Sequence, residues 1–361
     1  MLKSEDFKRE YHKILSSEVP HFLEKYLDLE ILKRLSGVGL LCGTDWTRLY
    51  SNNFYYSRLD HSIGSALITW NFTHDKKQTL SSLFHDVATG VFSHVNDFRK
   101  GDALKQEISE NQTEQILKNE KKLYSLLKED RIGLEEISDY HKYSVCDNEI
   151  PRLSSDRLEY MFPSNMIFSK KIKGKVWNLG EIKSIYKNIE ILKNEDNENE
   201  LGFSDEKKAL LYTEGFCSCA KILQKNENKL SLSFLGKIVN FALENKIITE
   251  KDCFSKSERE IIAIFDDFAQ KNKTSSFEEK RLLSRMILTW RKMKKVHSFS
   301  KEKNSEWFTV NLKVKKRYID PLVKIEGKTE RLSKVNEKAA EIIENYLDFE
   351  DKPFGAVKLI K

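Results

Sequence analysis

Two histidines and two aspartates in the first half of the chain have the side chains and the order expected of a metal site. His85 and Asp86 are adjacent in LSSLFHDVATGVFSH, His61 lies upstream in SRLDHSIG, and Asp156 lies downstream in SSDRLEY. Neutral imidazoles bind borderline metals through nitrogen, and two carboxylates supply the negative charge that holds a divalent ion. An ion with open coordination positions binds water and a substrate oxygen together. The four residues therefore predict a hydrolytic metal centre.

Each of these residues also has an ordinary structural explanation. A single buried histidine is more often a hydrogen-bonded core residue than a metal ligand, and a His-Asp dipeptide occurs by chance in many chains. Asp156 alone is explained as a helix N-cap or as the partner of Arg157. Taken as an ordered set, the four residues favour the metal site.

Helices must position most of these side chains. Apolar residues recur at i, i+3, i+4 and i+7 in most windows, and only 5 prolines and 14 glycines interrupt the 361 residues. The apolar series from Leu80 to Val87 predicts a helix anchored in the core, with His85 and Asp86 on a flank that faces a cavity. The chain is therefore predicted to be dominated by α-helix.

Short strands are expected only in the second half of the chain. We predict a strand at 186–192, a surface hairpin or loop at 194–205, three or four helices at 207–297, short strands within 307–332 and a final helix at 335–347. No internal repeat is found. The economical division is a catalytic core with the metal site at 1–165 and a helical C-terminal extension with short strands, packed on that core, at 166–361.

The composition is that of a large folded protein with a mixed-charge surface. With 39% hydrophobic and 11% aromatic residues, the chain can bury one large core or two moderate ones. The 62 basic and 56 acidic residues give a net charge of +6, but the basic residues are spread over many helical faces. This distribution favours a solvated surface over a nucleic-acid interface. Two lysine-rich runs near aromatic residues, at 291–295 and 313–317, keep nucleic-acid binding as a weaker expectation.

The cysteines and the hydropathy indicate the cellular location. The five cysteines are an odd number, and only Cys217 and Cys219 lie close together, at a spacing that fits neither a disulfide framework nor a zinc knuckle. No apolar stretch reaches the length of a signal peptide or a membrane span. We therefore expect a cytoplasmic protein with reduced thiols and no membrane partner.

Four short motifs carry a resemblance to a known family: R-L-D-H-S at 58–62, L-F-H-D at 83–86, F-S-H at 92–94 and D-R-L-E-Y at 156–160. In residue types, order and spacing they resemble the HD-domain metal-dependent phosphohydrolases, and most of all the branch that contains the deoxynucleoside triphosphate triphosphohydrolases. The resemblance is specific from about residue 29 to 162 and continues more weakly to about 350. It implies an HD-domain helical bundle, a nucleotide or other phosphate ester as substrate, and a symmetric homo-oligomer.

The resemblance also implies a role for each motif residue. It implies one divalent metal ion, for which Mn, Fe, Ni, Zn and Mg are all compatible with the ligand types. Arg58 and Arg157 would line the phosphate side of the pocket, where a guanidinium fork suits phosphoryl oxygens. His94, acting beside the metal ligand Asp86, would protonate the leaving oxygen or orient the scissile phosphate, and Tyr160 would flank the sugar. The implied metal ligands are His61, His85, Asp86 and Asp156.

Two of these roles have ordinary alternatives. Arg58 is also explained as the ion-pair partner of Asp60 or of another acid. Tyr160 lies one helical turn from Asp156 and is also explained as a core residue.

Three positions depart from the family pattern. Thr89 stands where the family has a histidine, Gln106 before Glu107 stands where a further histidine commonly precedes a glutamate, and Ser164 replaces an acid associated with the sugar hydroxyl. Threonine and glutamine do not titrate near neutral pH as imidazole does, so the departures weaken the proton-transfer apparatus but remove no implied metal ligand.

Two alternative functions therefore remain open. The first is an HD phosphoesterase that acts on a nucleoside monophosphate, a cyclic nucleotide or a nucleic-acid end. The second is a non-catalytic regulator that keeps the site in order to bind a nucleotide.

Overall fold

The computed structural model describes residues 4–50, 52–101 and 112–360, in which helices dominate and every named strand lies beyond residue 188. This confirms the predicted helix-rich fold with a few short strands in the second half. Among the described residues, every helix is too short or too polar to cross a lipid bilayer. The division at residue 165 stays a prediction.

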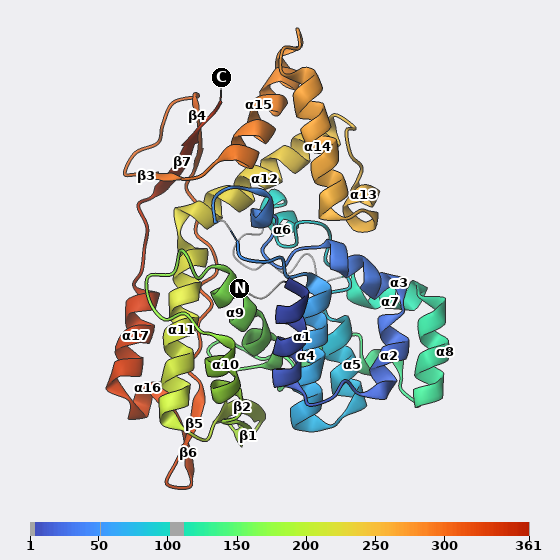
Figure 1. The fold of residues 1–361 in the computed structure, drawn as a ribbon, viewed down its shortest axis with the longest axis vertical. Helices are drawn as coiled ribbons and strands as arrows, with labels where there is room; N and C mark the ends of the chain where they lie inside the picture. The colour runs from blue at the N-terminus through green and yellow to red at the C-terminus, as the bar shows by residue number, and fades with distance from the viewer. Residues whose placement is uncertain (1–3, 51, 102–111, 361) are drawn as a thin grey trace.

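Most helices of the first half lie together on one side of the molecule (Figure 1). The α-helices there are α1 (Ser4–Leu15), α2 (His21–Leu27), α3 (Glu30–Lys33), α4 (Arg58–Thr73), α5 (Lys76–Phe84), α6 (Val95–Arg99), α7 (Thr113–Asn119), α8 (Lys121–Asp130) and α9 (Ser155–Ile167). Short 3-10 helices lie between them at η1 (Arg34–Gly37), η2 (Thr44–Trp46), η3 (Leu134–Glu136) and η4 (Tyr140–Lys142).

The second half adds further helices and two small sheets. Its helices are α10 (Leu179–Tyr186), α11 (Glu206–Gln224), α12 (Asn226–Glu244), α13 (Glu250–Ser255), α14 (Glu258–Asn272), α15 (Glu278–Lys292), α16 (Leu332–Val335) and α17 (Glu337–Leu347). Its strands are β1 (Ile189–Lys193), β2 (Asn199–Phe203), β3 (His297–Phe299), β4 (Trp307–Val310), β5 (Leu322–Ile325), β6 (Lys328–Arg331) and β7 (Phe354–Lys358).

The two sheets lie at opposite ends of the long axis of the molecule (Figure 1). One has the strand order β1-β2-β5-β6, in which β2 and β5 are parallel and the two outer pairs are antiparallel. The other has the order β3-β7-β4 and is antiparallel throughout. The segment 311–321, which is neither helix nor strand, connects the two sheets.

Several predicted boundaries of the second half were wrong. The strand expected at 186–192 begins at Ile189, because Tyr186 ends α10. The hairpin expected at 194–205 is present, since β1 and β2 pair antiparallel around 194–198, but its second arm Asn199–Phe203 is mostly buried rather than on the surface. The range 207–297 contains five helices rather than three or four, and β7 follows the last helix, where none was predicted. Strand propensity depends strongly on the neighbouring strands, which a local pattern does not reveal.

Side-chain caps set where the helices of the site begin. Ser57 accepts a hydrogen bond from the Asp60 backbone N–H, and the Asp60 carboxylate accepts one from the Ser57 N–H, so this capping box starts α4 at Arg58. Ser154 caps α9 by accepting from the Arg157 N–H. These caps place His61 and Asp156 within the first turns of their helices.

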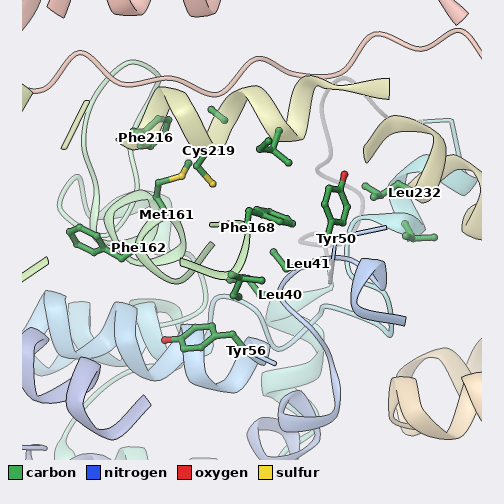
Figure 2. Packing of buried hydrophobic residues seen from close by; sticks show 14 of the residues in the cluster. Leu40, Leu41, Tyr50, Tyr56, Met161, Phe162, Phe168, Phe216, Cys219 and Leu232 are labelled. Atoms are coloured by element: carbon green, nitrogen blue, oxygen red, sulfur yellow. The ribbon is translucent and has the colours of Figure 1, made fainter. Parts of the chain in front are cut away.

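An apolar core joins α9 and α11 to the loop that precedes α4 (Figure 2). Met161 and Phe168 from α9 and its end, Cys219 from α11 and Leu40 from the loop are all buried in it. Because segments far apart in the sequence share this core, the loop before α4 is held at a fixed position relative to α9.

Glu258, the first residue of α14, links the second half of the chain to the loops beside the site. Its buried carboxylate accepts hydrogen bonds from the backbone N–H of Gly39 at 3.0 Å and of Phe92 at 3.1 Å, and from Trp46 Nε1 at 2.7 Å. A Cβ on Gly39 would lie 3.1 Å from Glu258 Oε2 and 3.2 Å from Asp45 Oδ2, so the two carboxyl groups flank this glycine. Burial, together with the charge of Asp45, raises the pKa of Glu258 to about 7.

We expect Glu258 to lower the stability of the native state as the pH rises from about 4.5 to about 7, and we expect Glu258→Gln to remove this contribution. The unfolded chain releases this proton near its ordinary pKa of 4.5, whereas the native state keeps it until about pH 7. The stabilisation is therefore complete below the unfolded pKa and is lost as the pH rises through the native pKa. A shift of this size corresponds to roughly 3 kcal/mol.

Urea unfolding at both pH values measures this effect. The control is Glu279→Gln, which removes an exposed carboxylate from α15. Identical pH dependence of the unfolding free energy in wild type and Glu258→Gln would disprove the expectation.

Candidate metal centre

His61 from α4 and His85 and Asp86 from the turn after α5 converge on one point. One possible ligand atom from each residue lies within 4.8 Å of the others, and all three residues are buried. His61 Nε2 lies 3.2 Å from His85 Nε2, and Asp86 Oδ2 lies 3.9 Å and 3.6 Å from these two nitrogens. The predicted helix around the His-Asp pair ends earlier than expected, at Phe84. The turn that follows, rather than a helical flank, directs both side chains to the same point.

Asp156, in the first turn of α9, approaches the same point. Its Oδ1 lies 3.0 Å from His61 Nε2 and 3.5 Å from His85 Nε2. The N-cap of α9 is Ser154, and the Arg157 guanidinium bonds to other groups, so neither ordinary explanation of Asp156 describes its position. The structure therefore brings together all four residues that the sequence predicted as ligands.

Hydrogen bonds on the far side of each imidazole fix which nitrogen faces the cluster. His85 Nδ1 donates to the backbone oxygen of Ser82 at 2.7 Å, and His61 Nδ1 lies 2.5 Å from Glu159 Oε2. In the neutral rings, both Nε2 atoms then present lone pairs to each other and to two carboxylates. Such a set repels itself unless a cation lies within it, and it matches the nitrogen and oxygen ligands of a divalent metal. The residues present therefore fit the implied ion.

The raised pKa of His61 shows that the groups around its Nε2 atom attract positive charge. Burial alone lowers the pKa of His61, but hydrogen bonds to Asp156 and Glu159 outweigh burial and raise it to about 10. Burial raises the pKa of Asp156, but its contacts with His61 and His85 hold it well below its ordinary range. A proton and a metal ion would compete for the same nitrogen, because the same carboxylates attract both.

Glu159 is the most important residue that the sequence analysis did not assign. It is fully buried on α9, and besides His61 it accepts a 2.6 Å hydrogen bond from Tyr56 Oη. A carboxylate that accepts from the outer nitrogen of a ligating histidine fixes the ring and increases its basicity. Glu159 lies one turn from Asp156 on the same helix, and this spacing was the available signal.

Arg58 and Thr89 both hold Asp86. Arg58 Nη1 lies 2.9 Å from Asp86 Oδ2, and Arg58 Nε donates to Ser93 Oγ at 3.0 Å. Arg58 therefore pairs with Asp86 rather than with Asp60. Thr89 Oγ1 donates to Asp86 Oδ1 at 2.8 Å. Where the family has a histidine that can titrate, this chain therefore has a hydroxyl that donates a hydrogen bond to Asp86, a predicted metal ligand. Gln106, the second departure, lies outside the described residues.

His94 follows a strained turn beside the cluster. Phe92 and Ser93 have φ angles of 63° and 50°, which cost non-glycine residues roughly 1–3 kcal/mol each. The turn is held by the bond from the Phe92 N–H to Glu258 and by the bond from Ser93 Oγ to Gly39 O. His94 Nδ1 lies 2.9 Å from Asp97 Oδ2, which leaves Nε2 for the cavity. Burial lowers the pKa of His94 despite the opposing effect of Asp97.

A cavity of about 850 Å³ adjoins the cluster and contains every predicted site residue in its lining. Tyr160 belongs to its wall, and the Tyr160 hydroxyl is buried without a hydrogen-bond partner in the described structure. An unsatisfied buried hydroxyl is costly, so this position fits a contact with a bound molecule better than a simple core role. Ser164, the third departure, also lines the cavity.

Arg157 reaches the wall of the cavity, but its guanidinium is engaged elsewhere. Nη1 donates to Asn148 Oδ1 and to the backbone oxygen of Arg152, and Nη2 donates to Asp147 Oδ1 and to the backbone oxygen of Asn148. Both terminal nitrogens therefore hold the loop 147–152. The phosphate-binding role of Arg157 stays a prediction.

No protein-family model matches the chain, and no curated protein matches it. The fold is nevertheless shared with solved structures. A phosphohydrolase from Bacteroides thetaiotaomicron VPI-5482 matches with a TM-score of 0.59 and 12% identity, over 91% of this chain and 94% of its own. A hypothetical protein from Aquifex aeolicus matches with a TM-score of 0.56 and 14% identity, over 95% of this chain and 93% of its own. The chain therefore has a phosphohydrolase-like fold with a buried His-His-Asp group suited to a metal ion.

Proposed function

We propose that the protein is a metal-dependent phosphohydrolase of the HD superfamily that hydrolyses a nucleotide, with a deoxynucleoside triphosphate as the proposed substrate. The observation that carries the proposal is the convergence of His61, His85, Asp86 and Asp156 at the wall of a cavity of about 850 Å³. The phosphohydrolase-like fold supports the reaction class. The HD type and the triphosphohydrolase branch rest on the four sequence motifs.

The metal ion would be held by the two Nε2 atoms and by the carboxylates of Asp86 and Asp156. A bound divalent ion supplies Lewis acidity toward a phosphoryl oxygen and lowers the pKa of a water molecule. Arg58 keeps Asp86 ionised, because its guanidinium holds the pKa of that carboxyl far below the ordinary value despite burial. Glu159 and Ser82 keep both imidazoles oriented with Nε2 toward the cavity.

The remaining residues of the cavity would act on the substrate. Arg58 donates from Nε and Nη1 to the protein, and its Nη2 has no hydrogen-bond partner among the described residues, so it is available to a phosphoryl oxygen. His94 Nε2 would transfer a proton to the leaving oxygen, since a phosphate nearby stabilises the imidazolium. The Tyr160 hydroxyl would donate to the sugar or to the phosphate chain.

His94→Ala should lower the turnover number by about a hundredfold or more while leaving the metal content unchanged, because general acid catalysis typically contributes factors of this size. Steady-state kinetics and elemental analysis of the same preparation measure the two quantities. His74→Ala is the matched control, since His74 caps the far end of α4 and does not line the cavity. An unchanged turnover number in His94→Ala would remove this residue from the mechanism.

A nucleotide panel with product identification tests the proposed substrate. Release of inorganic tripolyphosphate identifies a triphosphohydrolase, whereas release of orthophosphate from monophosphates or opening of cyclic nucleotides identifies a phosphoesterase. Thr89, which bonds to Asp86 instead of titrating, favours one further candidate, a nucleotide-binding regulator. Thermal stabilisation by nucleotides without turnover of any of them would support the regulator and contradict the enzyme.

A further inference from the structure

The segment 311–321 forms part of the cavity wall that comes from the second half of the chain. It runs from β4 in one sheet to β5 in the other, and these sheets lie at opposite ends of the molecule (Figure 1). Val314, Lys315 and Arg317 on this segment line the same cavity as the predicted metal ligands. Two cations from outside the motif region thus border the proposed active site.

The segment is anchored at Lys315, at Lys316 and at Asp320. Gln224 Nε2 on α11 donates to the backbone oxygen of Lys315 at 2.9 Å. The ammonium of Lys316 donates to the backbone oxygen of Leu347 at the end of α17, away from its two neighbours. Further along, the backbone N–H of Asp320 donates to Pro151 O at 2.9 Å. These anchors hold the segment beside the cavity, so the positions of Lys315 and Arg317 are built into the fold.

The positive charge of Arg317 affects the pKa of two residues that would surround the reacting phosphate. Burial is the largest cause that lowers the pKa of His94, and the positive charges of Arg58 and Arg317 lower it further, whereas the hydrogen bond to Asp97 opposes them. The charge of Arg317 also opposes the effect of burial on Tyr160, whose pKa is raised to about 12. Arg317 therefore lies close enough to His94 and Tyr160 for its charge to act on both.

The cavity needs such cations if it is to accept a polyanion. Its lining contains equal numbers of permanently charged cations and carboxylates: Arg58, Arg157, Lys315 and Arg317 against Asp86, Asp147, Glu149 and Asp156. A divalent ion at the predicted ligands would leave a net positive charge. Both terminal nitrogens of Arg157 already hold the loop 147–152, and the Nη1 of Arg58 holds Asp86.

We propose that Lys315 and Arg317, on the segment 311–321, bind phosphate oxygens of the substrate and take the role that the sequence motifs suggested for Arg157. Arginine binds phosphate through a planar fork and lysine through a compact point charge, so the pair suits a chain of more than one phosphate. The inference rests on the proposed function, because it assigns phosphate contacts in that same cavity. It also gives two cations of the lysine-rich run 313–317 a role at the cavity rather than on a nucleic-acid surface.

The test uses the full-length, metal-loaded protein and inorganic tripolyphosphate as the probe. Calorimetric titration compares wild type with Lys315→Gln, Arg317→Gln and the double variant. Each single substitution should raise the dissociation constant by about tenfold, as expected for loss of a charge-assisted hydrogen bond. Lys313→Gln is the matched control, because Lys313 is an exposed lysine of the same segment that does not line the cavity. Arg317→Lys should restore part of the affinity.

The outcomes separate this inference from the proposed function. Wild-type affinity in the double variant would overturn the inference, as would a wild-type protein that does not bind tripolyphosphate. If wild type hydrolyses nucleotides and the variants raise KM but not the dissociation constant of tripolyphosphate, only the inference fails. If Lys315 and Arg317 are needed for binding but no nucleotide is hydrolysed, the inference stands and the proposed enzyme activity fails.

Discussion

Asp86→Asn should abolish metal binding and hydrolysis together while the protein remains folded. Asp86 combines three contacts: Oδ2 faces both imidazoles, Arg58 pairs with the carboxylate, and Thr89 donates to Oδ1. The substitution keeps the size of the side chain but removes the negative charge that a divalent ion requires. We expect the turnover number to fall on the order of a hundredfold or more.

Stability must be measured in the same experiment, because the substitution leaves Arg58 buried without its ionic partner. Breaking a buried pair in this way costs about 3–5 kcal/mol. Asp147→Asn is the matched control: it removes a carboxylate of the same cavity that contacts Arg157 and lies outside the metal cluster. Asp147→Asn should keep its metal. A folded Asp86→Asn protein with undiminished metal and turnover would contradict the assignment of the ligands.

Glu159→Gln should weaken metal binding without removing any metal ligand. The buried carboxylate of Glu159 lies between His61 Nδ1 at 2.5 Å and Tyr56 Oη at 2.6 Å. The amide can preserve the volume and one hydrogen bond, but it cannot supply the charge that makes the imidazole a stronger ligand. Loss of such a partner typically costs 10–100-fold in metal affinity or activity, and we expect about this loss here.

A second variant, Gly64→Ala on α4, should disturb the same carboxylate of Glu159. A Cβ on Gly64 would lie 2.4 Å from Glu159 Oε1, so Gly64→Ala should displace the same carboxylate and lower the metal affinity in the same direction. Competition with a chromophoric chelator measures the affinity of both variants. Glu149→Gln serves as the control, since Glu149 lines the cavity outside the metal cluster. Wild-type metal affinity in both Glu159→Gln and Gly64→Ala would show that Glu159 does not support the ligand.

The sequence predicted the ligand set because each ligand belongs to a short motif with a recognisable neighbour pattern. It also predicted that helices would carry most of the fold, because apolar periodicity is a local property. The end of α5 at Phe84 was missed, because the apolar spacing continues to Val87 although the helix does not.

Contacts between distant segments could not be predicted. Glu159 meets His61 across 98 positions of sequence, and its spacing from Asp156 on α9, the one local signal, does not reveal that partner. The engagement of Arg157 by backbone oxygens of the loop 147–152 leaves no mark in the residue types. In the sequence, Lys315 and Arg317 belong to a basic run typical of a solvated surface. Only the position of the segment 311–321 in the fold shows that they line the cavity.

The central claim is that hydrolysis depends on an ion held by His61, His85, Asp86 and Asp156. The most direct test titrates metal-stripped protein with a divalent metal while bound metal and nucleotide hydrolysis are followed in the same sample. The account predicts that turnover rises in proportion to metal bound at one site and saturates when that site is full. Hydrolysis by the metal-free protein at the full rate, or a saturated site with no turnover of any nucleotide, would contradict it.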